Sequence, residues 1–114
     1  MEERTVNICG KDVRLRYCSA TETGFEDIAG KPIGSLDAKR QRDILALCSA
    51  AIVAAYSRND ENAPITSKDI LYEATPEEIV ELAKAVFEMR NEWYHIPKVV
   101  DDIIPRAEGE GEKN

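Results

Sequence analysis

Three cysteines and one histidine are the residues of this chain best suited to nucleophilic chemistry or metal binding. Cys9, Cys18 and Cys48 are odd in number and widely spaced, which argues against a disulfide framework and is typical of a reducing cytosol. Zinc sites usually need closely spaced ligand pairs, whereas His95 is the only histidine. We therefore expect packed, structural thiols, no metal site and no cofactor.

The candidate catalytic groups all have structural explanations. His95 follows two aromatic residues at the predicted end of a helix, where an imidazole often caps free carbonyl groups. Cys9 falls in a predicted turn, and no residue close to it in sequence would lower its thiol pKa. The carboxylate pairs at 77–78 and 101–102 are adjacent residues that diverge in direction, a poor geometry for acid/base work.

Phosphate-binding and nucleophile motifs are also missing from the sequence. Gly24, Gly30 and Gly34 do not have the spacing of a phosphate-binding loop, and no serine lies in a nucleophile elbow. The sequence therefore predicts no catalytic residue and a protein that is not an enzyme.

The composition limits the class of protein and of partner. A chain of 114 residues, 43% hydrophobic and 32% charged, is long enough for one globular domain with a modest core. The net charge is -7, and residues 59–114 alone carry about -8 when Asp and Glu are counted against Lys and Arg. Such an acidic half repels phosphate backbones, so we expect no nucleic-acid partner. Acidity instead favours solubility or attraction to a basic partner.

No segment has the pattern of a secretion signal or a membrane span. The chain starts MEERTVNICG, which is polar and lacks an apolar core. The longest uncharged run, residues 44–57, is shorter than the roughly 20 residues that cross a bilayer. We expect a cytoplasmic protein with no membrane partner.

The opening residues predict a β-hairpin. Residues 5–8 and 13–17 alternate apolar with polar or charged side chains, the period of a strand with one buried face. Residues 9–12 separate the two runs, and Gly10 can adopt the positive φ of a tight turn.

Capping residues predict two helices in the first half of the chain. Ser19 followed by Glu22 matches a capping box, and Gly30 matches a left-handed stop. Phe25 and Ile28 of this helix are predicted to face the core. The next helix is predicted over residues 36–56. It carries no charge from Ile44 until Arg58, so we expect it to be buried on nearly all sides.

Two further helices follow. Thr66 or Ser67 caps a short one, and Thr75-Pro76-Glu77-Glu78 has the cap, first-turn proline and capping-box glutamate of a long helix that ends near His95. The fold class is therefore α+β, with an N-terminal β-hairpin packed on a bundle of about four helices. We expect a single domain over residues 1–97 and a C-terminal extension over 98–114, whose last residues are disordered.

The candidate partner-binding residues lie at the end of the last helix and beyond it. Large aromatic side chains are enriched in binding hot spots, and branched apolar residues here follow the core helix. The alternative is that residues 99–104 fold back over the core. The candidates are Trp93, Tyr94, Ile96, Val99, Val100, Ile103 and Ile104.

The order of these elements, together with several motifs, resembles the tail assembly chaperones of tailed phages and prophages. The motifs are VNICGKDVRLRY, FEDIAGKPI and DILALCSAAIVAAY, followed by the acidic stretches SKDIL and TPEE. The resemblance covers about residues 5–90, and residues 97–114 match no pattern of that family.

The resemblance implies a non-enzymatic assembly factor of the bacterial host cytoplasm that is absent from the finished particle. Such chaperones bind and solubilise the long helical tape measure protein and help to recruit tail tube subunits. The resemblance supplies no catalytic, cofactor or metal residue.

Two other functions remain open from the sequence. One is a small cytoplasmic adaptor that binds a single partner by strand addition at the edges of the hairpin. The other is a thiol-based redox sensor that uses Cys9 or Cys18. A homo-oligomer is also possible, because a second copy can cover an apolar helix face.

Overall fold

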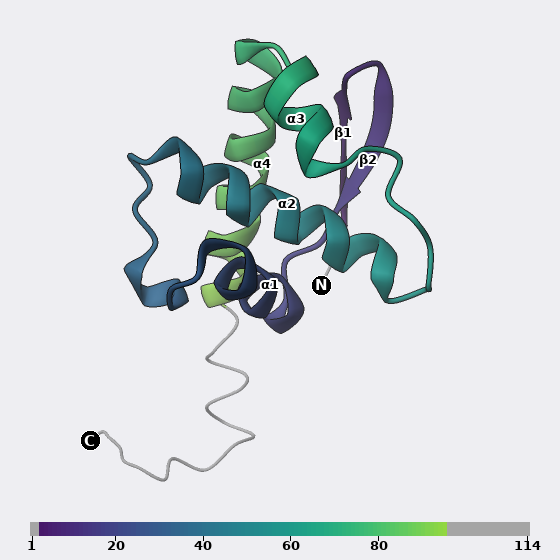
Figure 1. The fold of residues 1–114 in the computed structure, drawn as a ribbon. Helices are drawn as coiled ribbons and strands as arrows, with labels where there is room; N and C mark the ends of the chain where they lie inside the picture. Colours follow the sequence, from purple (N-terminus) through teal and green to yellow (C-terminus); the bar gives the residue numbers. More distant parts are fainter. Residues whose placement is uncertain (1–2, 96–114) are drawn as a thin grey trace, which may run out of the picture.

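Residues 3–95 are described by a computed structural model, and within them the chain has the predicted α+β fold. Figure 1 shows α2 crossing the middle of the molecule, with α1 and α3 on either side of it and α4 behind it. The predicted boundary after residue 97 and the extension 98–114 lie outside the described residues. The elements are β1 (Arg4–Ile8), β2 (Lys11–Leu15), α1 (Ser19–Ala29), the 3-10 helix η1 (Ile33–Ser35), α2 (Gln41–Ser57), α3 (Ser67–Glu73) and α4 (Pro76–Tyr94).

The hairpin is confirmed, with a tighter turn than predicted. β1 and β2 pair antiparallel, and only Cys9 and Gly10 lie between the strands. Both have positive φ, 55° and 76°, as a two-residue turn that matches the strand twist requires. β2 therefore begins at Lys11. The buried side chains of the two strands are Ile8, Val13 and Leu15.

The predicted cap of α1 is wrong by one residue. Cys18, and not Ser19, is the N-cap, and its backbone N–H donates a hydrogen bond to Thr21 Oγ1 at 3.1 Å. Glu22 is not the capping carboxylate because it accepts hydrogen bonds from two tyrosine hydroxyls instead. The stop is as predicted, since Gly30 is the left-handed C-cap with φ of 72°.

The start of α2 differs from the prediction by five residues. The helix begins at Gln41 and not at residue 36. Asp37 makes a local turn, in which its Oδ1 accepts from the Lys39 N–H at 2.9 Å and its carbonyl accepts from the Arg40 N–H at 2.9 Å. The Asp43 carboxylate then accepts from the Asp37 N–H at 2.8 Å. These bonds satisfy backbone groups without a helix, so the helix starts after the turn.

The caps of α3 and α4 follow the predicted pattern. Thr66 caps α3 and forms a reciprocal capping box with Asp69. Thr75 caps α4, Pro76 occupies its first turn, and Glu78 completes the box. These are local interactions between residues three apart, which is why the sequence predicts them well.

α2 is the centre of the core, as its lack of charge predicts. Twelve of its 17 residues are buried. It approaches α1 closely at Gly24, where a Cβ atom would lie 3.2 Å from the Cβ of Ala50. Within residues 3–95, no helix has the length and apolar character needed to cross a membrane.

Candidate functional site

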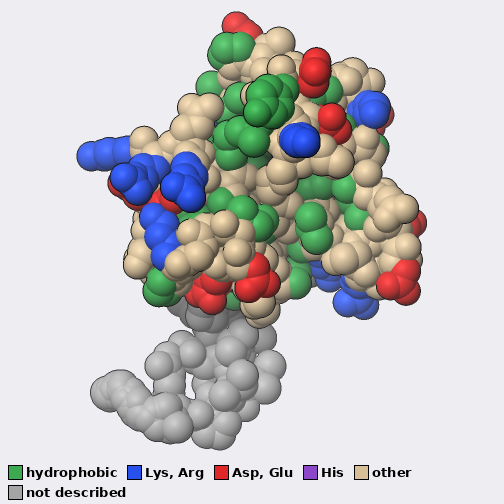
Figure 2. All heavy atoms as spheres, in the orientation of Figure 1, with side chains coloured by type: hydrophobic (Ala, Val, Ile, Leu, Met, Phe, Trp, Pro, Cys, Tyr) green, Lys and Arg blue, Asp and Glu red, His purple; other side chains and the backbone are tan. Residues whose placement is uncertain are grey.

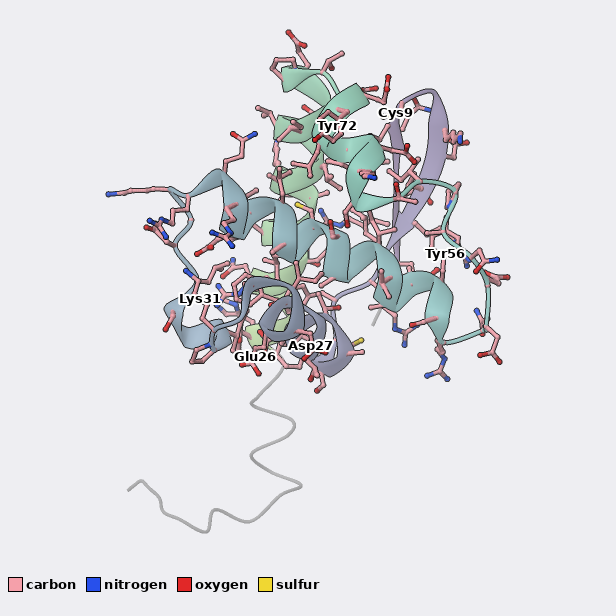
Figure 3. The ribbon with its side chains drawn as sticks, viewed as in Figure 1. Cys9, Glu26, Asp27, Lys31, Tyr56 and Tyr72 are labelled. Carbon is pink, nitrogen blue, oxygen red and sulfur yellow. The ribbon has the colours of Figure 1, made fainter. Side chains whose placement is uncertain are left out.

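Two of the three thiols have raised pKa values. Burial raises the pKa of Cys48 to about 12. Partial burial, together with Glu78 and Asp69, raises the pKa of Cys9. Figure 3 shows Cys9 at the tip of the hairpin beside α3, and its sulfur lies 3.9 Å from the carbonyl oxygen of Asp69. A raised pKa leaves less thiolate at neutral pH, the opposite of what a reactive thiol needs.

His95 is the C-cap residue of α4 and lies on the surface. Its Nδ1 lies 2.6 Å from the carbonyl oxygen of Asn91, which can only accept, so Nδ1 carries the proton. This is the carbonyl-capping role expected from the sequence. In the described part of the chain, no three His, Cys, Asp or Glu side chains are grouped so that they could hold a metal ion.

Of the seven candidate partner-binding residues, the structure places only Trp93 and Tyr94. Trp93 is partly buried against the core, and its ring centroid lies 5.6 Å from that of Tyr17. Tyr94 is 41% exposed, and its hydroxyl donates to Glu22. Both aromatics therefore fasten the end of α4 to the rest of the fold. The other five candidates, Ile96, Val99, Val100, Ile103 and Ile104, lie outside the described residues.

Two backbone N–H groups on the outer edge of the hairpin, one in β2 and one just after it, form hydrogen bonds to α2. The Arg14 N–H donates to the Tyr56 hydroxyl at 3.1 Å, and the Arg16 N–H donates to the Ala51 carbonyl at 3.1 Å. In the turn, the Cys9 N–H donates to Glu78 Oε2 at 3.0 Å. A strand added to the hairpin beside β2 would have to displace α2, so this edge is not free for the strand addition that the adaptor function needs.

An apolar groove opens between α1, α2 and α3. It has a volume of about 390 Å³, and one face of α2 forms its floor. Leu45, Ala46 and Ile70 are buried there, whereas Ile28 and Leu71 on the two lips are 52% and 61% exposed. Figure 2, drawn in the orientation of Figure 1, shows exposed hydrophobic side chains in the region of α3. The groove presents apolar surface with few polar partners, so it suits an apolar ligand.

The sequence does not predict this groove. Ile28 is expected in the core, but its side chain lies on the lip of the groove and is about half exposed. A signal was present in Ile70, Leu71 and Tyr72, because three successive apolar residues on one helix cannot all face the core. Ile70 is buried, whereas Leu71 and Tyr72 are 61% and 79% exposed. Figure 3 shows Tyr72 on the outer side of α3.

Comparison of the chain with protein-family models, with curated proteins and with solved structures finds no match.

Proposed function

We propose that this protein binds an apolar segment of another polypeptide and keeps that polypeptide soluble, without catalysing a reaction. The observation that carries the proposal is the groove between α1, α2 and α3, whose lips expose Ile28 and Leu71 beside a buried apolar floor. Exposed apolar surface of this kind is unusual on a small acidic domain unless a partner covers it.

The proposed partner comes from the resemblance stated above. As a phage or prophage tail assembly chaperone, the protein binds the apolar stripes of a long helical tape measure protein and helps to recruit tail tube subunits. The proposed setting is the cytoplasm of a bacterial host. The net charge of -7 supports this function, because an acidic surface keeps a complex with an apolar chain in solution.

The two rival functions have less support. Strand addition beside β2 meets amide groups that are already bonded to α2. A redox sensor needs an accessible thiol with a lowered pKa, whereas partial burial and nearby carboxylates raise the pKa of Cys9, one of its two candidate thiols.

The first test of the proposal is co-expression with a tape measure protein encoded beside this chain. We expect the soluble fraction of the tape measure protein to rise several-fold, because the chaperone covers its apolar stripes. The measurement is the amount of tape measure protein in the supernatant after centrifugation. The control replaces the chaperone with an unrelated acidic domain of similar size and charge. An equal soluble fraction in both cultures would contradict the proposed function.

A further inference from the structure

The floor of the groove is long enough to contact one face of a short helix. Its floor is a stripe of α2 that recurs every three to four residues, at Gln41 and Arg42, Leu45 and Ala46, and Ser49. At about 1.5 Å per residue this stripe is about 12 Å long, or roughly two helical turns. α1 and α3 form the two walls, so the apolar face of a partner helix can lie along α2 between them.

The two ends of the groove differ in polarity. Arg42 is the one charged residue among those that line it, and it lies in the first turn of α2. At the other end, Ser67 Oγ donates to Ser49 Oγ at 3.1 Å, which makes that end neutral and closed by its own hydrogen bond. A ligand therefore meets positive charge at one end only.

The basic residues at the Arg42 end form no ion pair with the described residues. Of the ion pairs formed by residues 3–95, none includes Lys39, Arg40 or Arg42. The nearby carboxylate of Asp43 forms its ion pair with Lys31 instead, at 2.6 Å. Figure 2 shows Lys and Arg side chains gathered on the edge of the molecule where, in Figure 1, the chain leads into α2. In a chain of net charge -7, this end of the groove is a local exception.

We infer that the groove binds an amphipathic helix of a partner protein whose apolar face is about two turns long and ends in carboxylate side chains, which meet Arg42. The apolar face covers Leu45, Ala46 and Ile70 between the lips. The carboxylates set the direction of the helix in the groove, because reversing it would bring them to the neutral end. This inference rests on the proposed function and names the part of the partner that is recognised.

The test uses the full chain and two synthetic helical probes labelled with fluorescein, each about 14 residues long, enough for the probe to extend beyond the groove. Both carry leucines with the spacing i, i+3, i+4, i+7. One has two glutamates at one end of this face, and the other has two lysines there. Fluorescence anisotropy measures their affinities. We expect the acidic probe to bind at least about tenfold more tightly than the basic probe.

Charge reversal tests the role of Arg42. R42E is expected to weaken binding of the acidic probe about tenfold and to strengthen binding of the basic probe, a reversal that loss of fold would not produce. The matched control is R58E, at the exposed C-terminal end of the same helix, which should change neither affinity. Equal effects of R42E and R58E would overturn the inferred direction of binding.

Two substitutions of equal exposure test the groove itself. L71D on its lip should weaken binding of the acidic probe about tenfold, whereas V80D on α4 should not, although Leu71 and Val80 are 61% and 62% exposed. If the chain solubilises the tape measure protein and L71D leaves both solubility and probe binding unchanged, the inference about the groove is wrong and the proposed function stands.

Two other occupants give different results. A dimer of the full chain that sedimentation detects, and that L71D dissociates, would show that a second copy fills the groove and would overturn the inference. Displacement of the acidic probe by a peptide of residues 97–105, as effective as unlabelled probe, would show that the chain's own VVDDII sequence is the occupant and would overturn it as well.

Discussion

Asp43 is the buried carboxylate that organises the turn before α2. It is 2% exposed, accepts from the Asp37 N–H and forms an ion pair with Lys31 at 2.6 Å. The hydrogen bond from Lys31 and that from Asp37 hold the pKa of Asp43 below its ordinary value of 3.8. Because the native state favours the ionised form, this group stabilises the fold above that value.

The predicted consequence is a loss of stability in acid. As the pH falls below about 4 and through the lowered pKa of Asp43, the native carboxylate is protonated and its contribution is lost. Thermal unfolding followed by circular dichroism from about pH 6 to about pH 3 measures the loss. D43N should be less stable than the parent at pH 6 and should show a smaller decrease towards pH 3. A parallel decrease in both proteins would contradict this role of Asp43.

The thiols give a second prediction at the residue scale. Because the pKa values of Cys9 and Cys48 are raised, we expect both to react with iodoacetamide at neutral pH more slowly than a free cysteine does. Mass spectrometry of the alkylated protein gives the rate at each site, and the same protein in urea is the control, in which the rates should rise. Rapid alkylation of native Cys9 would contradict this prediction and would support the redox-sensor function.

The contact between α1 and α2 depends on a residue with no side chain. A Cβ at Gly24 would lie 3.2 Å from the Cβ of Ala50, so a larger side chain must push the two helices apart. G24L is expected to reduce the free energy of unfolding by about 1–3 kcal/mol, which urea denaturation measures. The control is G34L, since nothing lies within 4 Å of a Cβ built at Gly34. Equal losses in both variants would show that the close approach is not responsible.

The elements differ in how well the sequence predicts them, and the reason is the range of the interactions that define them. The cap at Thr75 and the turn at Gly10 depend on residues within three positions, and both are confirmed. The predicted start of α2 is wrong because the Asp43 carboxylate accepts a hydrogen bond from the Asp37 N–H, six residues earlier, and so stabilises a turn. The prediction that Glu22 caps α1 is wrong because its carboxylate instead accepts a hydrogen bond from Tyr94, 72 residues away.

At the scale of the whole molecule, the α+β fold was predicted and the candidate site was not. The hydrophobic pattern of α2 identifies it as the central helix, but the groove depends on where α1 and α3 end relative to it. No periodicity within one helix reports that spacing, so Ile28 was predicted to face the core. The predicted binding residues after His95 remain a prediction, because the structure does not describe them.

The pairing of the first strand with the last helix has a consequence for protein synthesis. Arg4 of β1 forms ion pairs with Glu88 and Glu92 of α4, at 2.7 and 2.8 Å. A two-stranded hairpin is marginal without a surface to cover its apolar face. The ribosome makes that hairpin before α4, so the nascent chain cannot complete these contacts until α4 has left the exit tunnel.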